Sequence, residues 1–128
     1  MKLRKSIVVR RNGSIALWTA VIVILSLLPK SALQHQHLPL FKGADKIVHF
    51  IMYLILMWLW YLRSLVTGDK KYIIAGTIYS IALGVVLEYI QRDYIAGRTF
   101  DVYDILANIT GVFAVIIFII LKNLKNEF

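Results

Sequence analysis

The sequence predicts an all-α membrane protein, a bundle of four transmembrane helices with both termini on the cytoplasmic side. The 128 residues are 59% hydrophobic and only 17% charged, with a mean hydropathy of +0.72. Soluble domains carry about 45–50% apolar and about 25% charged residues. The apolar residues form four continuous runs, separated by charged or turn-rich segments: Ile15–Leu28, Ile47–Leu62, Tyr72–Leu87 and Ile105–Leu121. With its flanking residues, each run approaches the roughly 17–25 residues that a spanning helix needs.

We therefore expect one transmembrane domain over residues 1–128, with helices at about 13–29, 46–63, 72–91 and 102–122. Two other architectures do not fit. A soluble bundle of helices that are apolar all round would leave little polar surface to face water. A transmembrane barrel needs strands with alternating polarity, and these runs are continuous. The chain has no cysteine, which excludes disulfides and cysteine-ligated metals.

The N-terminal segment, MKLRKSIVVRRNGS, contains five basic residues and no acidic one. Positive residues concentrate on the cytoplasmic side of short membrane proteins, so we expect the N-terminus inside. A secretory signal peptide is the competing interpretation, because it also combines a basic start with an apolar stretch. The following segment, PKSAL, is a poor small-residue cleavage site, which favours an uncleaved first helix.

The distribution of charge agrees with four spans from an inside start. The predicted inner segments contain ten Lys and Arg residues against Asp69 and Glu127, whereas the outer segments contain five residues of each sign. The formal net charge of +8 therefore lies on the predicted cytoplasmic side. This asymmetry indicates topology and removes most of the case for nucleic acid as a partner, leaving the lipid bilayer.

The connections between the runs differ in length. The first outer segment, PKSALQHQHLPLFKGAD, is the longest, and its two prolines and one glycine argue against a continuous helix. His35 and His37 resemble a pair of metal ligands, but histidines that alternate in a loop are more often solvated polar residues. The inner connection, RSLVTGDKK, is short, so the second and third helices should be antiparallel neighbours.

Polar residues recur on one face of each of the last three predicted helices, at the spacing of three or four that places side chains on one side. The three rows are Asp45, His49 and Tyr53, with Lys46 beside them; Glu88 and Gln91; and Asp101, Asp104, Asn108 and Gly111, preceded by Arg98. The second and fourth helices enter from outside and the third exits there. At about 1.5 Å per residue, the rows should meet just beneath the outer interface. The small residues Gly76, Ser80 and Gly84 would allow close helix packing, within the bundle or between copies.

Two roles compete for these residues. In a scaffold, Arg98 and Lys46 would neutralise carboxylates while the other polar residues complete a hydrogen-bonded network. Ionisable side chains in a bilayer are costly, at about 2.5–3.5 kcal/mol each at the midplane and less near the rim, so a purely structural use would be wasteful. Four carboxylates also exceed two cations, so a shared proton, a bound cation or an amine-bearing ligand should supply charge. We therefore favour a functional site.

The candidate acid–base or cation-binding residues are His49, Glu88, Asp101 and Asp104, and the candidate binding residues are Asp45, Lys46, Tyr53, Gln91, Arg98 and Asn108. One histidine with several carboxylates suits a hard divalent cation better than structural zinc. A divalent cation is therefore the one cofactor that the residues suggest, and no metal is assigned. We expect Arg98 to pair with Asp101 or Glu88, although an arginine there would also suit a phosphate.

Two blocks carry a family resemblance: DKIVHFIMY, from Asp45 to Tyr53, and ExxQ followed by RxxDxxDxxxNxxG, from Glu88 to Gly111. With these blocks the chain resembles the VanZ-like family of small bacterial polytopic membrane proteins, over roughly Leu25 to Phe118. The resemblance implies a multi-pass protein of the bacterial plasma membrane. It also implies a link to teicoplanin, a glycopeptide antibiotic that acts on cell-wall precursors, because the namesake of the family is associated with low-level resistance to it.

We therefore expect an envelope protein whose outward-facing pocket binds an envelope lipid or a lipid-linked cell-wall intermediate and modifies glycopeptide sensitivity. The alternative is an intramembrane enzyme on a lipid-linked substrate, with His49 and a carboxylate as acid and base and a divalent cation as candidate cofactor. A proton- or cation-coupled transporter is the weakest hypothesis, because no polar path leads from the cluster towards the inside. The residues leave open whether the protein is an enzyme, and its oligomeric state.

Overall fold

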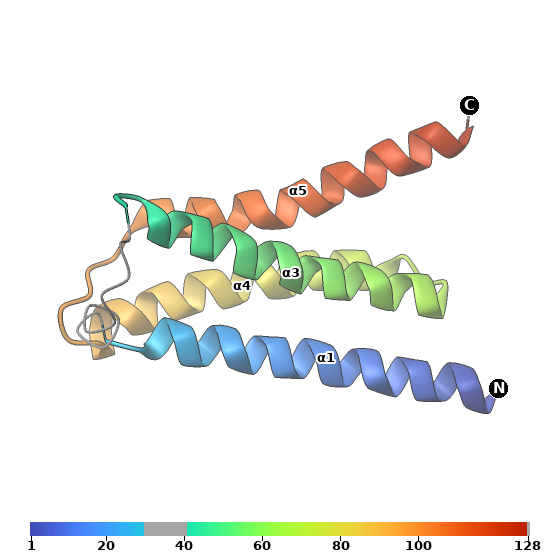
Figure 1. Cartoon of the computed structure of the whole chain (residues 1–128), viewed down its shortest axis with the longest axis horizontal. Helices are drawn as coiled ribbons and strands as arrows, with labels where there is room; N and C mark the ends of the chain where they lie inside the picture. The colour runs from blue at the N-terminus through green and yellow to red at the C-terminus, as the bar shows by residue number, and fades with distance from the viewer. Residues whose placement is uncertain (30–40, 128) are drawn as a thin grey trace.

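The computed structural model describes residues 1–29 and 41–127. Within them the chain forms four helices and no strand (Figure 1): α1 (Lys2–Leu27), α3 (Ala44–Thr67), α4 (Lys71–Tyr94) and α5 (Val102–Glu127). Each is long and apolar enough to cross a membrane, so the predicted all-α, four-helix membrane fold is confirmed. His35 and His37 lie outside the described residues.

The helices extend beyond the apolar runs. α1 begins at Lys2 rather than near residue 13, because the lysines, leucine and arginines of its first turns favour a helix. α3 lies between two glycines with left-handed backbone, Gly43 (φ 91°) and Gly68 (φ 74°). The amide of Gly68 donates to the carbonyl of Ser64 at 2.8 Å, which closes the last turn of α3.

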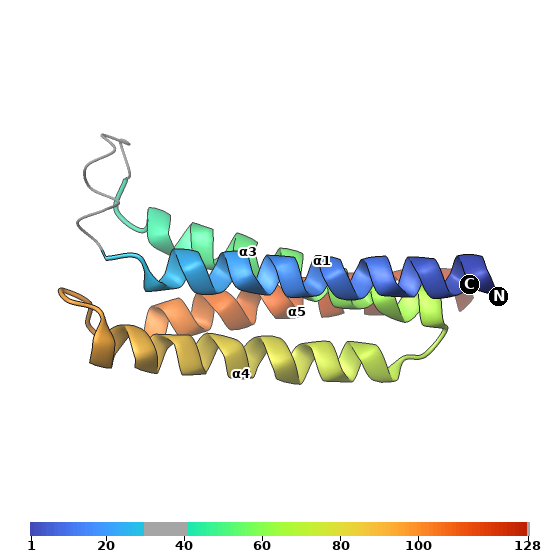
Figure 2. The ribbon, with the colours of Figure 1, turned by 90° about the horizontal axis from the view of Figure 1, so that it is seen from below.

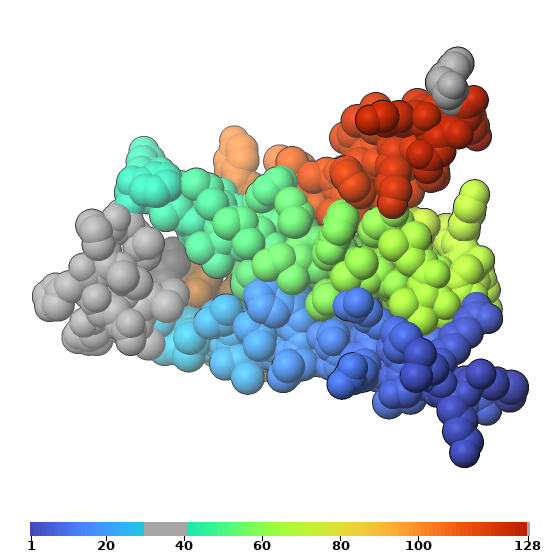
Figure 3. Space-filling model, turned by 45° about the vertical axis from the view of Figure 1, so that its right-hand side comes forward, coloured from blue at the N-terminus to red at the C-terminus, as the bar shows by residue number. Residues whose placement is uncertain are grey.

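α3 is the central helix of the bundle. It packs against α1, α4 and α5, and most extensively against α5. α4 also contacts α1 and α5 and runs along one side of the other helices (Figure 2). Among the described residues α1 and α5 do not pack on each other. The C-terminal part of α5 diverges from the bundle (Figure 1) and projects from its body (Figure 3).

Apolar side chains fill the interior and also cover the outside of the bundle. Tyr53, Leu56 and Met57 of α3 are almost fully buried together with Ile22 of α1 and Val112 of α5. Large apolar side chains are exposed on all four helices, among them Leu17, Ile51, Ile74, Ile78 and Ile117. A bundle that is apolar inside and outside is expected when lipid surrounds it.

The small residues of α4 serve packing within one chain. Gly76, Ser80 and Gly84 are all buried. A Cβ atom on Gly76 would lie 2.5 Å from the Cβ of Trp60 on α3, closer than two such atoms can approach. This row therefore lets α3 and α4 approach each other, which is the first of the two arrangements that the sequence allowed.

Candidate functional site

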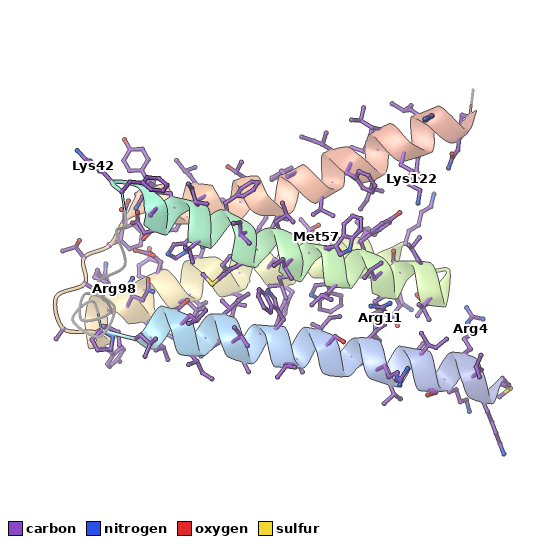
Figure 4. The ribbon with its side chains drawn as sticks, in the orientation of Figure 1. Arg4, Arg11, Lys42, Met57, Arg98 and Lys122 are labelled. Carbon is purple, nitrogen blue, oxygen red and sulfur yellow. The ribbon has the colours of Figure 1, made fainter. Side chains whose placement is uncertain are left out.

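The ammonium group of Lys46 is the centre of an ion cluster at the end of the bundle opposite the termini, the end where Figure 4 labels Lys42 and Arg98. Its Nζ lies 2.9 Å from Asp45 Oδ2 and 2.5 Å from Asp101 Oδ2. It also forms an ion pair with Asp104 Oδ1. These carboxylates belong to the starts of α3 and α5, where the helix dipole favours negative charge. The fold thus brings two helix N-termini to one lysine.

Asp101 joins the start of α5 to the ion cluster. Its Oδ1 accepts a hydrogen bond from the Tyr103 amide at 2.8 Å, which makes Asp101 the N-cap of α5. The hydrogen bond from Lys46 to the other carboxylate oxygen lowers the pKa of Asp101 below its ordinary value. The backbone amide of Asp101 donates to Glu88 Oε1 at 2.6 Å, so a buried carboxylate of α4 holds the same turn.

His49 lies one turn deeper in α3, between two side chains of α5. Its Nδ1 donates to Asn108 Oδ1 at 3.0 Å, and its Nε2 lies 3.7 Å from Asp104 Oδ2. Because an amide oxygen only accepts hydrogen bonds, Nδ1 is the donor in this bond, and Nε2 is the ring nitrogen that faces Asp104. All three side chains are buried, so this part of the cluster is shielded from solvent.

Two glycines bring the three helices together at this level. A Cβ atom on Gly111 of α5 would meet the backbone oxygen of Phe50 and lie 3.0 Å from the amide nitrogen of Leu54, both on α3. A Cβ atom on Gly84 of α4 would lie 2.9 Å from Asn108 Nδ2. The close approach of α5 to α3 and α4 therefore depends on the missing side chains.

Tyr53 and Glu88 are almost fully buried at the level of the cluster. Their exposed fractions are 1% and 2%. Tyr53 Cε1 lies 3.3 Å from the position that a Cβ atom of Gly84 would occupy, so its ring packs between α3 and α4. We interpret Tyr53 as a packing residue beside the site.

Two of the predicted binding residues contact α1 instead of the ion cluster. Gln91 Nε2 donates to the Ser26 carbonyl at 2.6 Å, and an Arg98 terminal nitrogen donates to the Leu28 carbonyl at 3.2 Å. Arg98 forms no ion pair with the carboxylates of the described residues, so the expected pairing with Asp101 or Glu88 is wrong. Both side chains satisfy carbonyls that the end of a helix leaves without an intrahelical partner.

The carboxylates around Lys46 are the type of ligand that a divalent cation prefers, but in this structure the ammonium group occupies the space between them. Oxygen atoms of Asp45, Asp101 and Asp104 lie within 4.8 Å of one another, and hard cations prefer such ligands. Lys46 Nζ contacts all three groups, so its ammonium stands where a metal ion would. A cation would therefore fit only after Lys46 withdraws, and we assign none.

A comparison with family models decides the family of the chain. The model of the VanZ/LLP1 family matches residues 5–123. The chain belongs to the VanZ/LLP1 family. A search of curated proteins and a search of solved structures found no match. The VanZ/LLP1 match covers nearly the whole chain, and with four apolar helices it makes this chain a multi-pass membrane protein of the VanZ type.

Proposed function

We propose that this VanZ/LLP1 protein acts in the bacterial cell envelope by binding the amine-bearing headgroup of an envelope lipid or of a lipid-linked cell-wall intermediate. The binding site is the polar cluster, defined here as Asp45, Lys46, His49, Glu88, Asp101, Asp104 and Asn108. With both termini in the cytoplasm, this cluster faces the outer leaflet of the plasma membrane. Binding of cell-wall intermediates there would alter sensitivity to teicoplanin.

The observation that carries the proposal is the excess of carboxylates in a shielded place. The cluster holds four carboxylates and one ammonium group: Lys46 pairs with three of them, Glu88 accepts only from the Asp101 amide, and Arg98 contacts the end of α1 instead. Glu88 and Asp104 are only 2% and 6% exposed. Buried charges require a partner, and a second amine, supplied by a ligand, would provide it.

The surroundings of the cluster favour a lipid as the carrier of that amine. Exposed apolar side chains flank the cluster on α3 and α5, namely Ile47, Val48, Ile51, Val102 and Leu106. A lipid could place its headgroup against the carboxylates while its chains stay in the bilayer and pack against this apolar surface. A soluble amine would use only the first of these contacts.

The test is a lipid-binding measurement on the purified protein in nanodiscs. Asp104→Asn keeps the size of the side chain and removes one carboxylate charge, and Asp93→Asn is the matched control, because Asp93 pairs with Arg92 on the surface. We expect native mass spectrometry to show at least about tenfold less bound phosphatidylethanolamine or lipid-linked intermediate for Asp104→Asn, since a lost charged hydrogen bond is worth about 1.5–3 kcal/mol. Equal binding by both variants at unchanged melting temperature would contradict the proposal.

The second candidate function is an enzyme acting on a lipid-linked substrate, and the geometry of His49 favours it. Asn108 orients the imidazole, and Nε2 faces the shielded Asp104, an arrangement that suits a general base. In the same nanodiscs, His49→Gln should then abolish conversion of the bound intermediate while lipid still binds. If the wild type leaves the intermediate chemically unchanged, binding alone is the function.

A further inference from the structure

The end of the bundle that holds the termini carries an excess of positive charge. The polar cluster lies at the opposite end and does not contribute to it. The first eleven residues contain five basic side chains, among them Lys2, Lys5 and Arg11, and no acidic one. The other helices and the connection between α3 and α4 add Arg63, Lys70, Lys71, Lys122 and Lys125, against Asp69 and Glu127. Figure 4 shows Arg4, Arg11 and Lys122 at this end.

Several of these cations contact neutral groups. Arg4 donates to the carbonyls of Val66 and Thr67, and Lys122 donates to the hydroxyl of Tyr61. The Arg63 guanidinium lies 4.3 Å from the ring centre of Tyr72. Among the described residues at this end, only Lys71 forms an ion pair with a carboxylate, that of Asp69. The positive charge is therefore left for a ligand to neutralise.

Two of these basic residues, Arg10 and Arg11, line a groove on α1. The groove has a volume of about 570 Å³, and Ile7, Arg10, Arg11 and Ser14 form its wall. Two arginines that line one groove suit a phosphate, because each guanidinium can give it two parallel charge-assisted hydrogen bonds. Ile7 adds an apolar side to the same wall. The groove thus combines an anion site with an apolar contact.

The depth of the groove in the membrane follows from the length of the apolar part of α1. Ile15–Leu28 covers about 21 Å at 1.5 Å per residue, less than the roughly 30 Å thickness of the hydrocarbon core. When α1 spans the bilayer, Arg10 and Arg11 therefore lie at the edge of the hydrocarbon. This is the level at which lipid phosphates are found.

We propose that this groove binds the phosphate headgroup of an anionic phospholipid from the leaflet on the side of the termini. The same phosphate chemistry could come from a soluble phosphate, but the apolar wall and the interfacial depth favour a lipid. Anionic leaflets attract basic segments of proteins at their surface, and the groove gives that attraction a defined place. This site is independent of the polar cluster, which lies at the other end of the bundle.

The test compares two double variants that remove the same charge from the same helix. Arg10→Gln with Arg11→Gln changes the groove, whereas Lys2→Gln with Lys5→Gln changes exposed residues outside it. Each protein is placed in phosphatidylcholine nanodiscs with increasing phosphatidylglycerol, and bound phosphatidylglycerol is counted by native mass spectrometry. We expect the groove variant to bind at least about tenfold more weakly, because it loses the direct charge-assisted hydrogen bonds to the phosphate, and the lysine variant to stay within about twofold of the wild type, because its changes lie outside the groove.

Two results would overturn the proposal. Equal losses in both double variants would mean that net charge alone attracts the lipid. Full displacement of phosphatidylglycerol by millimolar inorganic phosphate would mean that the groove takes soluble phosphate. Melting temperatures of both variants are measured alongside, and we expect them to match the wild type because the groove side chains lie at the surface.

Discussion

At the scale of single residues, Lys46 organises the polar cluster. Its ammonium contacts three carboxylates from two helices, so it draws the starts of α3 and α5 together. His49 and Asn108 form a second, deeper layer in which hydrogen bonds fix the orientation of the imidazole. The shallow layer is ionic and partly exposed, whereas the deep layer is shielded. The proposed ligand would approach through the first to reach the second.

The ion pair between Lys46 and Asp101 predicts how stability depends on pH. Because the pKa of Asp101 is lower in the folded protein than in the unfolded chain, the pair contributes stability above about pH 4, the ordinary range for an aspartate. That contribution is lost as the pH falls through the lower, folded value. Thermal unfolding between pH 6 and pH 2 should show a smaller loss of melting temperature for Asp101→Asn than for the wild type.

The control for this measurement is Glu127→Gln, which removes an exposed carboxylate near the C-terminus. Its melting temperature should follow that of the wild type throughout the pH range. Parallel curves for the wild type and Asp101→Asn would show that the pair with Lys46 makes no contribution to stability.

At the scale of elements, the helices are joined in two ways. α3, α4 and α5 approach closely at glycines, with Gly111 against the backbone of α3 and Gly84 against Asn108. Hydrogen bonds from side chains to backbone carbonyls attach α1: side chains of α1 donate to carbonyls of its neighbours, and a side chain of α4 donates to a carbonyl of α1. For example, Trp18 Nε1 donates to the carbonyl of Met52 at 2.9 Å, and Gln91 donates to that of Ser26. The glycine contacts position the cluster, and the polar contacts hold α1 beside it.

Gly111→Ala should destabilise the protein, because the added methyl group would meet the backbone of α3, which cannot rotate away as a side chain can. Overpacking of this kind costs about 1–3 kcal/mol. The measurement is thermal or denaturant-induced unfolding in detergent.

The matched control is Gly13→Ala, since nothing lies within 4 Å of the added atom on α1. It should leave the protein unchanged or stabilise it by up to about 1 kcal/mol, because alanine favours a helix over glycine. If the two variants unfolded alike, the close contact between α5 and α3 would not limit stability.

At the scale of the whole molecule, the two ends of the bundle differ in chemistry. The termini and the groove on α1 lie at one end, where basic residues are in excess, and the polar cluster lies at the other (Figure 4). The positive-inside tendency places the basic end in the cytoplasm. This orientation stays a prediction, and the envelope function that we propose depends on it.

Cysteine labelling tests the orientation directly, because the chain has no cysteine of its own. Lys70→Cys and Thr99→Cys introduce thiols at exposed positions in the two connections at opposite ends of the bundle. In intact cells, a membrane-impermeant maleimide should label Thr99→Cys and leave Lys70→Cys unlabelled until the cells are opened. The reverse pattern would place the polar cluster in the cytoplasm and would contradict the proposed envelope function.

The sequence by itself determined the number and type of the helices, because continuous apolar runs of this length have one stable arrangement in a membrane. It also predicted which residues share a face, and the structure brings His49, Asp104 and Asn108 into contact as those faces require. The roles of these residues stay a prediction.

Only the tertiary structure decided which partner each polar side chain has. Arg98 and Gln91 bond to backbone carbonyls of α1 rather than to the carboxylates of the cluster, and Lys46 alone gathers three of the four acids. Periodicity gives the direction of a side chain around its own helix, but a partner depends on the distance and depth of the neighbouring helix. Distance and depth are set here by close contacts at glycines, with Gly111 against the backbone of α3 and Gly84 against the side chain of Asn108, and the spacing of the polar residues does not reveal these contacts.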